Sequence, residues 1–112
     1  MKKNLIVLFA FLITSQWVLT AQDIQVPLRF DHYYSYDQVV EALQALHNKY
    51  PDLTSLDLIG YSEENRAIYG LTISNPKTGD HLSKPGVYVD GNIHGNEIQA
   101  GEVCLYLANQ IS

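Results

Sequence analysis

The chain has 112 residues, of which 46% are hydrophobic and 17% are charged, and its formal net charge is −5 at pH 7. An acidic balance argues against binding to nucleic acid or to anionic membranes, because both carry negative charge themselves. The single cysteine, Cys104, excludes an internal disulfide framework. Burial as an inert thiol is the expected state of that residue.

The first 21 residues have the order of a secretory signal peptide. Two lysines form a basic start, residues 5–13 are an apolar stretch, and Ala21 is a small residue at its end. A membrane anchor is the alternative, but a span needs about 20 predominantly apolar residues, and polar residues 14–16 interrupt this one. We expect cleavage after Ala21, with Thr20 as a second choice. The protein would then be secreted or periplasmic, with no stable membrane span.

Cleavage leaves residues 22–112, which are enough for one small domain. The lost segment holds two of the 7 basic residues and none of the 12 acidic ones, so the mature chain is more acidic still. Its last predicted helix runs to Ser112 without a glycine cap or a proline stop. We therefore expect residues 22–112 to be the N-terminal part of a larger, truncated domain.

The first helix is predicted after a short leader, residues 22–32, that is either extended or a tail. Ser35 is a suitable N-cap, and Gln38 stands at the capping-box position. Pro51 ends the helix. Four apolar residues recur at spacings that place them on one helix face: Val39, Leu43, Leu46 and Tyr50.

A β-hairpin is predicted next, from Leu56–Tyr61, a turn at residues 63–65 and a second strand over Arg66–Ser74. Alternation in the second strand places four side chains on one face: Ala67, Tyr69, Leu71 and Ile73. A polar loop with two prolines and two glycines follows over residues 75–86.

A short, mostly apolar strand is predicted over residues 87–90, as expected for the centre of a sheet that is covered on both faces. A helix should begin near Asn96 or Glu97. One stripe of this helix is apolar (Ala100, Cys104, Leu107 and Ile111), and other apolar residues point in other directions, which is typical of a helix buried in a larger protein. The order of elements predicts an α/β fold, in which functional residues gather at the carboxyl ends of strands.

His94 and Glu97 lie at that end of the predicted strand, three residues apart, and can converge on one point. Zinc takes imidazole nitrogen and carboxylate oxygen, so these two residues are candidate metal ligands, with ligating atoms within roughly 3–5 Å of each other. Gly91 and Gly95 would let the backbone approach the metal and substrate closely. The alternative is structural: Glu97 complements a helix N-terminus, and His94 satisfies a backbone group.

At these residues the sequence resembles the zinc carboxypeptidases of the carboxypeptidase A type, the M14 metallopeptidases. Three stretches carry the resemblance in the family's order: "YSYDQVVEALQALHNKYPDL", "IGYSEENRAIYGLTIS" and "DGNIHGNE". The resemblance covers nearly all of residues 32–112 but only about the first third of the family's single domain, a three-layer structure with a mixed sheet between helices.

The resemblance implies that His94 and Glu97 are the first two ligands of a catalytic Zn²⁺. The third ligand, the glutamate that acts as general base and the residues that grip the substrate lie further along the family's sequences and have no counterpart here. The other histidines precede the motif and are expected to be surface or structural residues: His32, His47 and His81. Asn65 stands where the family often has glycine, which we expect to be harmless.

The function implied is that of an exported metallocarboxypeptidase acting on C-terminal peptide bonds of peptide or protein substrates, with residues 1–112 alone inactive. Two alternatives stay open. One is a zinc N-acyl amino acid hydrolase of the aspartoacylase type, which uses a similar His-Gly-x-Glu stretch. The other is a non-catalytic or truncated relative that acts only as a binding module.

Overall fold

The computed structural model describes residues 26, 28–29 and 31–112. The expected signal peptide and its cleavage site fall outside these residues. The elements in chain order are α2 (Tyr36–Lys49), β1 (Thr54–Tyr61), β2 (Ala67–Ile73), the short 3₁₀ helices η1 (Pro76–Thr78) and η2 (His81–Ser83), and α3 (Gln99–Ile111).

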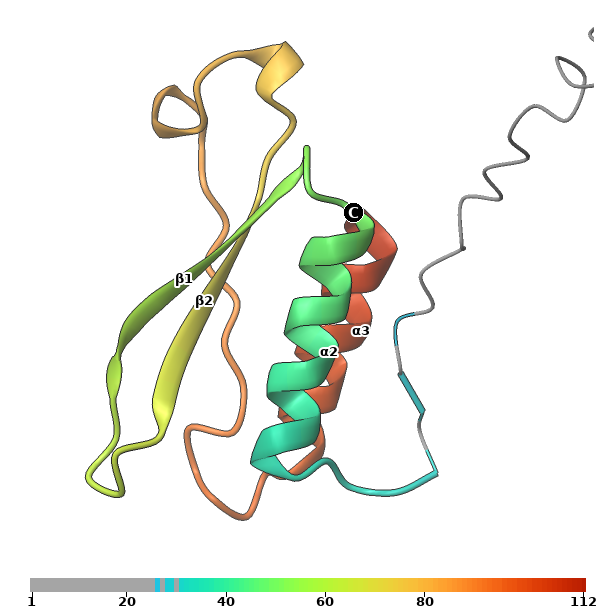
Figure 1. Cartoon of the computed structure of the whole chain (residues 1–112), viewed down its shortest axis with the longest axis vertical. Helices are drawn as coiled ribbons and strands as arrows, with labels where there is room; N and C mark the ends of the chain where they lie inside the picture. The colour runs from blue at the N-terminus through green and yellow to red at the C-terminus, as the bar shows by residue number, and fades with distance from the viewer. Residues whose placement is uncertain (1–25, 27, 30) are drawn as a thin grey trace, which may run out of the picture.

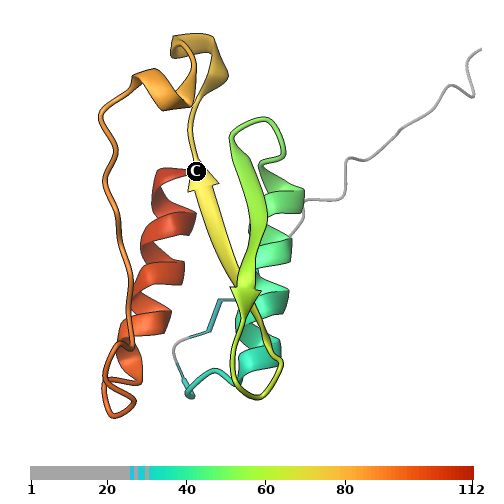
Figure 2. The ribbon, with the colours of Figure 1, turned by 90° about the vertical axis from the view of Figure 1, so that its left-hand side faces the viewer.

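Two layers make up the fold. The strands β1 and β2 form an antiparallel hairpin, and α2 and α3 lie side by side against one face of it (Figures 1 and 2). Helix α2 contacts both β1 and α3. Helices layered on a sheet confirm the predicted α/β class.

Local signals in the sequence define α2. The backbone N–H of Gln38 donates to Ser35 Oγ at 3.4 Å, and the backbone N–H of Ser35 donates to Gln38 Oε1 at 2.9 Å, which completes the predicted capping box. At the other end, the N–H of Tyr50 donates to the Leu46 carbonyl, and Pro51 follows outside the helix.

The hairpin turn lies where the sequence predicts it and is held by contacts of Asn65 and Arg66. Asn65 has a φ of +59°, the left-handed conformation that asparagine tolerates better than most residues. Arg66 forms an ion pair with Glu64 at 2.6 Å, and its guanidinium lies 5.8 Å from the ring centre of Tyr36. The ladder runs from Thr54↔Ile73 to Tyr61↔Ala67, with an irregularity at Ile59.

A small core lies between the two helices. Ala42 and Leu46 of α2 are fully buried, and Leu105 of α3 is 3% exposed. The predicted apolar face of α2 is confirmed, because its other members pack around this core. Partly buried apolar residues complete it: Val26, Leu28, Tyr34, Val39, Leu43, Tyr50, Leu71 and Ala108.

The strand predicted over residues 87–90 is wrong for this structure. These residues belong to no strand, and β1 and β2 pair only with each other. Val87 and Tyr88 are 90% and 86% exposed. The physical reason is that an extended segment becomes a strand only when a neighbour completes its hydrogen-bond ladder, and the described residues offer it none.

Helix α3 begins at Gln99, two to three residues after the predicted start. Its buried face also differs from the predicted stripe, since Leu105 and Glu102 are buried whereas Ile111 is 61% exposed. Among the described helices and strands, α2 makes the main contact with α3, and several other apolar side chains of α3 are exposed, among them Val103 and Ile111. Within the described part of the chain, no helix has the length and apolar character needed to cross a membrane.

Candidate metal centre

The candidate ligands lie in the loop that joins the extended segment to α3. This loop, residues 91–98, sits at the same end of the molecule as the hairpin turn (Figure 1). The short helices η1 and η2 lie at the opposite end. The loop therefore stands apart from η1, η2 and the segment that holds them.

Two successive turns shape the loop. Before them, Asn92 adopts the left-handed conformation with a φ of +64°. The N–H of Glu97 then donates to the His94 carbonyl at 2.9 Å, and the N–H of Ala100 donates to the Glu97 carbonyl at 2.9 Å. These turns place His94 and Glu97 on the same side of the backbone, immediately before α3 begins.

The two side chains meet. His94 Nδ1 and Glu97 Oε1 are 3.2 Å apart, within the expected range of separation. The side chains are 73% and 53% exposed, so both groups are accessible. The capping alternative receives no support, because the N-cap of α3 is Ile98 and no side chain caps this helix.

This arrangement supplies two donors of the types that zinc prefers, one nitrogen and one oxygen. The same two side chains also form a hydrogen bond with each other without any metal, and this contact is an ion pair when the imidazole is protonated. Among the residues described, no three His, Cys, Asp or Glu side chains are grouped so that they could hold a metal ion. A catalytic zinc site uses three protein ligands, and this pair could supply at most two of them.

The two glycines of the loop differ in what surrounds them. A Cβ on Gly91 would lie 2.6 Å from the carbonyl oxygen of Ala100, so Gly91 approaches α3 itself. A Cβ on Gly95 would meet nothing within 4 Å. Only Gly91 is therefore required for close packing.

Asp90 influences the pKa of the Cys104 thiol. Burial raises the pKa of the Cys104 thiol, and the negative charge of Asp90 raises it further. A thiol with a raised pKa is protonated at neutral pH and a poor nucleophile. Cys104 therefore has the inert character predicted for it, although it is only partly buried.

The other histidines each have a local partner. His47 Nδ1 lies 3.0 Å from the buried Thr54 Oγ1, which joins the end of α2 to β1. His32 contacts Asp31 at 2.7 Å, and this hydrogen bond is the main cause of the lowered pKa of Asp31. His81 lies 3.4 Å from Asp80. These contacts agree with the expected structural roles.

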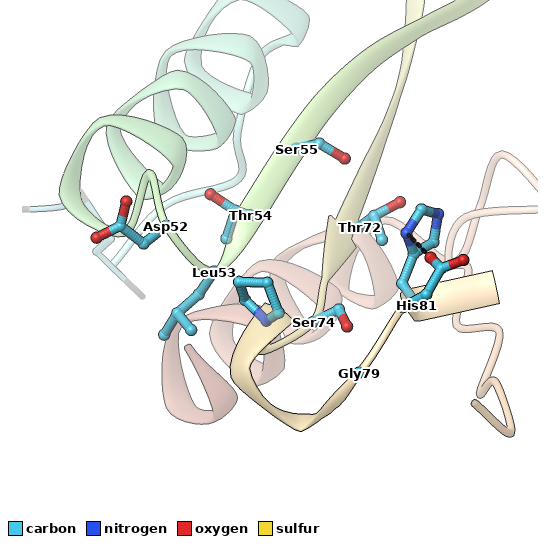
Figure 3. A pocket seen from close by; sticks show the side chains of 10 residues that line it. Asp52, Leu53, Thr54, Ser55, Thr72, Ser74, Gly79 and His81 are labelled. Atoms are coloured by element: carbon cyan, nitrogen blue, oxygen red, sulfur yellow. Dashed lines mark ion pairs between the residues drawn. The ribbon is translucent and has the colours of Figure 1, made fainter. Parts of the chain in front are cut away.

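A shallow hollow of about 320 Å³ lies at the opposite end of the molecule, between the start of β1 and the loop with η1 and η2 (Figure 3). Its lining includes Asp52, Thr54, Thr72, Ser74, Asp80 and His81. Neither His94 nor Glu97 lines it. The hollow is therefore separate from the candidate metal centre.

Sequence reasoning missed one polar residue that supports α3. Glu102 is 9% exposed and accepts a hydrogen bond from the backbone N–H of Tyr34 at 3.0 Å. The only signal in the sequence was its position, since a glutamate three residues before Leu105 falls on the buried face of α3.

Comparison with known proteins confirms the resemblance to the zinc carboxypeptidases. A family model described as zinc carboxypeptidase, Peptidase_M14, matches residues 39–112. The catalytic chain of carboxypeptidase N from Rattus norvegicus is 41% identical over 83 residues, which cover 73% of this chain and 18% of that protein. Carboxypeptidase B from Astacus astacus is 33% identical over 78 residues, 70% of this chain and 24% of that protein.

Carboxypeptidase D from Mus musculus is 37% identical over 76 residues, which cover 68% of this chain and 6% of that protein. The chain thus spans less than a quarter of the length of these relatives. The family match covers more than half of the chain, and the candidate ligands lie inside it. The chain belongs to the zinc carboxypeptidase family of peptidases.

Proposed function

We propose that this chain is the N-terminal part of the catalytic domain of an exported zinc metallocarboxypeptidase, with residues 22–112 contributing its first two zinc ligands, His94 and Glu97. The enzyme would hydrolyse the C-terminal peptide bonds of peptides or proteins. The observation that carries the proposal is the 3.2 Å separation of His94 Nδ1 and Glu97 Oε1 in a chain of this family.

The donor atoms of His94 and Glu97 are of the types that zinc binds, and their separation suits a tetrahedral ion. Two ligands at about 2.0–2.2 Å from a tetrahedral ion are roughly 3.3–3.6 Å apart, so the observed separation needs little adjustment. When bound, zinc would polarise the scissile carbonyl and lower the pKa of its water. The contribution of His94 and Glu97 is to hold the ion at the accessible end of the loop.

The exposed apolar residues support a larger domain. Val87 and Tyr88 are almost fully exposed, and Val103 and Ile111 of α3 are each 61% exposed. Large exposed apolar areas on a soluble protein often mark a surface that another part of the protein or a partner covers. Further strands and helices of the same catalytic domain would cover it, which agrees with the small share of each relative that this chain spans.

Export rests on residues 1–21, whose basic start, apolar stretch and small residue have the order of a signal peptide. N-terminal sequencing of the exported protein should give Gln22 as the first residue. A protein that keeps Met1 would contradict both the cleavage and the separation of this segment from the domain. The acidic net charge of −5 agrees with a protein that does not bind nucleic acid.

The test of the activity is a carboxypeptidase assay on the protein expressed from its complete reading frame. His94→Ala should lower kcat/KM by more than about a hundredfold, because replacing a residue that only supports a ligand already costs about 10–100-fold. His81→Ala is the matched control and should leave the rate unchanged, since the His81 side chain pairs with Asp80. The short helix η2, which contains His81, lies at the opposite end of the molecule from residues 91–98. Equal activity of the unchanged protein, His94→Ala and His81→Ala would contradict the proposed site.

The N-acyl hydrolase alternative is separated by the same assay. An enzyme of that class would release an acyl group from an N-acyl amino acid and would leave the C-terminal residue of a peptide in place. The relatives found by comparison are carboxypeptidases by name, which favours the peptidase.

A further inference from the structure

Gly91 lies unusually close to the first turn of α3. A Cβ at this position would be 2.6 Å from the Ala100 carbonyl oxygen, 2.7 Å from its carbonyl carbon and 3.0 Å from Cys104 Sγ. The two closest atoms belong to helix backbone, which cannot rotate away as the end of a side chain can. Only glycine permits this approach without movement of the loop or of the helix.

This contact closes the loop that carries the candidate ligands. Gly91 begins the loop and Ala100 follows it, so the two residues bring its ends together. Between them, Asn92 turns the chain at a φ of +64°, and the N–H groups of Glu97 and Ala100 donate to the carbonyls of His94 and Glu97. The close approach of Gly91 to Ala100 fixes where this loop starts relative to α3.

We propose that Gly91 is the positioning residue of the His94–Glu97 pair, holding the start of the loop against α3 so that the imidazole and the carboxylate meet. The inference rests on the proposed function of these side chains as metal ligands. Any side chain at position 91 pushes the loop away from Ala100 and separates the pair. Gly95 has no such role, because a Cβ there would lie in open space.

The test is a titration of the 112-residue chain with zinc chloride. NMR monitors the titration through the ring signals of His94. The His94→Ala chain assigns these signals. In the unchanged chain they should shift with zinc until saturation, and the nuclear Overhauser effect between the His94 ring and the Glu97 side chain should be observed without metal. Gly95→Ala is the matched control, with the same added methyl group in the same loop.

We expect Gly91→Ala to weaken zinc binding at His94 by about 10–100-fold, the cost typical of losing a residue that orients a ligand, and to abolish the Overhauser effect between the pair. In Gly95→Ala, the zinc affinity at His94 and the intensity of the Overhauser effect should both stay within twofold of the values in the unchanged chain. The Leu105 methyl signals report the core between α2 and α3, which contains neither glycine, and should be the same in all variants.

Three outcomes would overturn the inference. Unchanged zinc binding in Gly91→Ala, with binding intact in the unchanged chain, would remove the role of Gly91 and leave the proposed metal ligands standing. Loss of the Leu105 signals in Gly91→Ala would make Gly91 a residue of the fold instead of the site. No response of His94 to zinc in the unchanged chain would remove the proposed ligand pair, and the positioning role with it.

Discussion

The backbone N–H of Tyr34 donates a 3.0 Å hydrogen bond to Glu102 Oε1, although 68 residues separate the two in sequence. Tyr34 precedes α2, whereas Glu102 lies in the first turn of α3 on its buried face. The bond therefore joins the segment before one helix to the start of the other. It lies one helical turn from Leu105, the residue through which α3 enters the core.

Replacing Glu102 by alanine should lower the free energy of unfolding by about 1–3 kcal/mol, because a hydrogen bond to a charged, buried acceptor is lost. Glu102→Gln keeps an amide oxygen as acceptor and should cost less. Urea unfolding followed by far-ultraviolet circular dichroism measures both. Glu41→Ala is the control, since Glu41 is an exposed glutamate of α2, and it should change stability by no more than about 0.5 kcal/mol.

The hairpin turn depends on the left-handed backbone of Asn65. Asn65→Val should destabilise the chain by about 1–2 kcal/mol, because a β-branched residue is strained at a φ of +59°. Asn65→Gly should be nearly neutral, since glycine adopts this conformation freely but loses more entropy on folding. Urea unfolding gives the comparison, and an equal effect of the two substitutions would contradict the role assigned to the turn.

The Cys104 thiol should titrate above the ordinary value of 9.0, first because it is partly buried and second because of the charge of Asp90. Asp90→Asn should therefore lower the thiol pKa and move the pH profile of its reaction with an aromatic disulfide reagent to lower pH. Asp57→Asn removes an exposed carboxylate from β1 and should leave the profile unchanged. An identical profile in the Asp90 variant would contradict the electrostatic contact.

The same shift makes stability depend on pH. A thiol whose pKa is raised in the folded chain contributes stability that is complete below pH 9, the ordinary value, and that is lost as the pH rises through the folded pKa. The Cys104→Ala chain lacks this group. The stability difference between the two chains should therefore be constant up to about pH 9 and should shift against the unchanged chain at higher pH.

Elements governed by local chemistry could be predicted from the sequence. The capping box of Ser35 and Gln38 and the apolar spacing around Leu46 define α2 without reference to the rest of the chain. Alternation in β2 and the tolerance of Asn65 for a positive φ define the hairpin. The three-residue spacing of His94 and Glu97 likewise predicts that their side chains can meet, and one local turn, from the Glu97 N–H to the His94 carbonyl, joins the two residues.

Features that depend on distant partners could not be predicted. The apolar composition of residues 87–89 favours a strand, but no strand lies beside them among the described residues, so the ladder does not form. The bond from Tyr34 to Glu102 joins residues whose proximity follows only from the packing of the two helices. The contact of Gly91 with Ala100 likewise depends on the direction in which α3 leaves the loop.

The 112-residue chain alone should release no C-terminal residues from peptides, even with added zinc. A catalytic zinc site needs three protein ligands and a base that handles the proton of the attacking water. Of these, the described residues group only His94 and Glu97. The assay incubates the chain with peptides that differ in their C-terminal residue and follows their masses, with the protein from the complete reading frame as positive control. Release by the 112-residue chain that stops when a chelator is added would show that two donors suffice, and would refute the requirement for a third ligand.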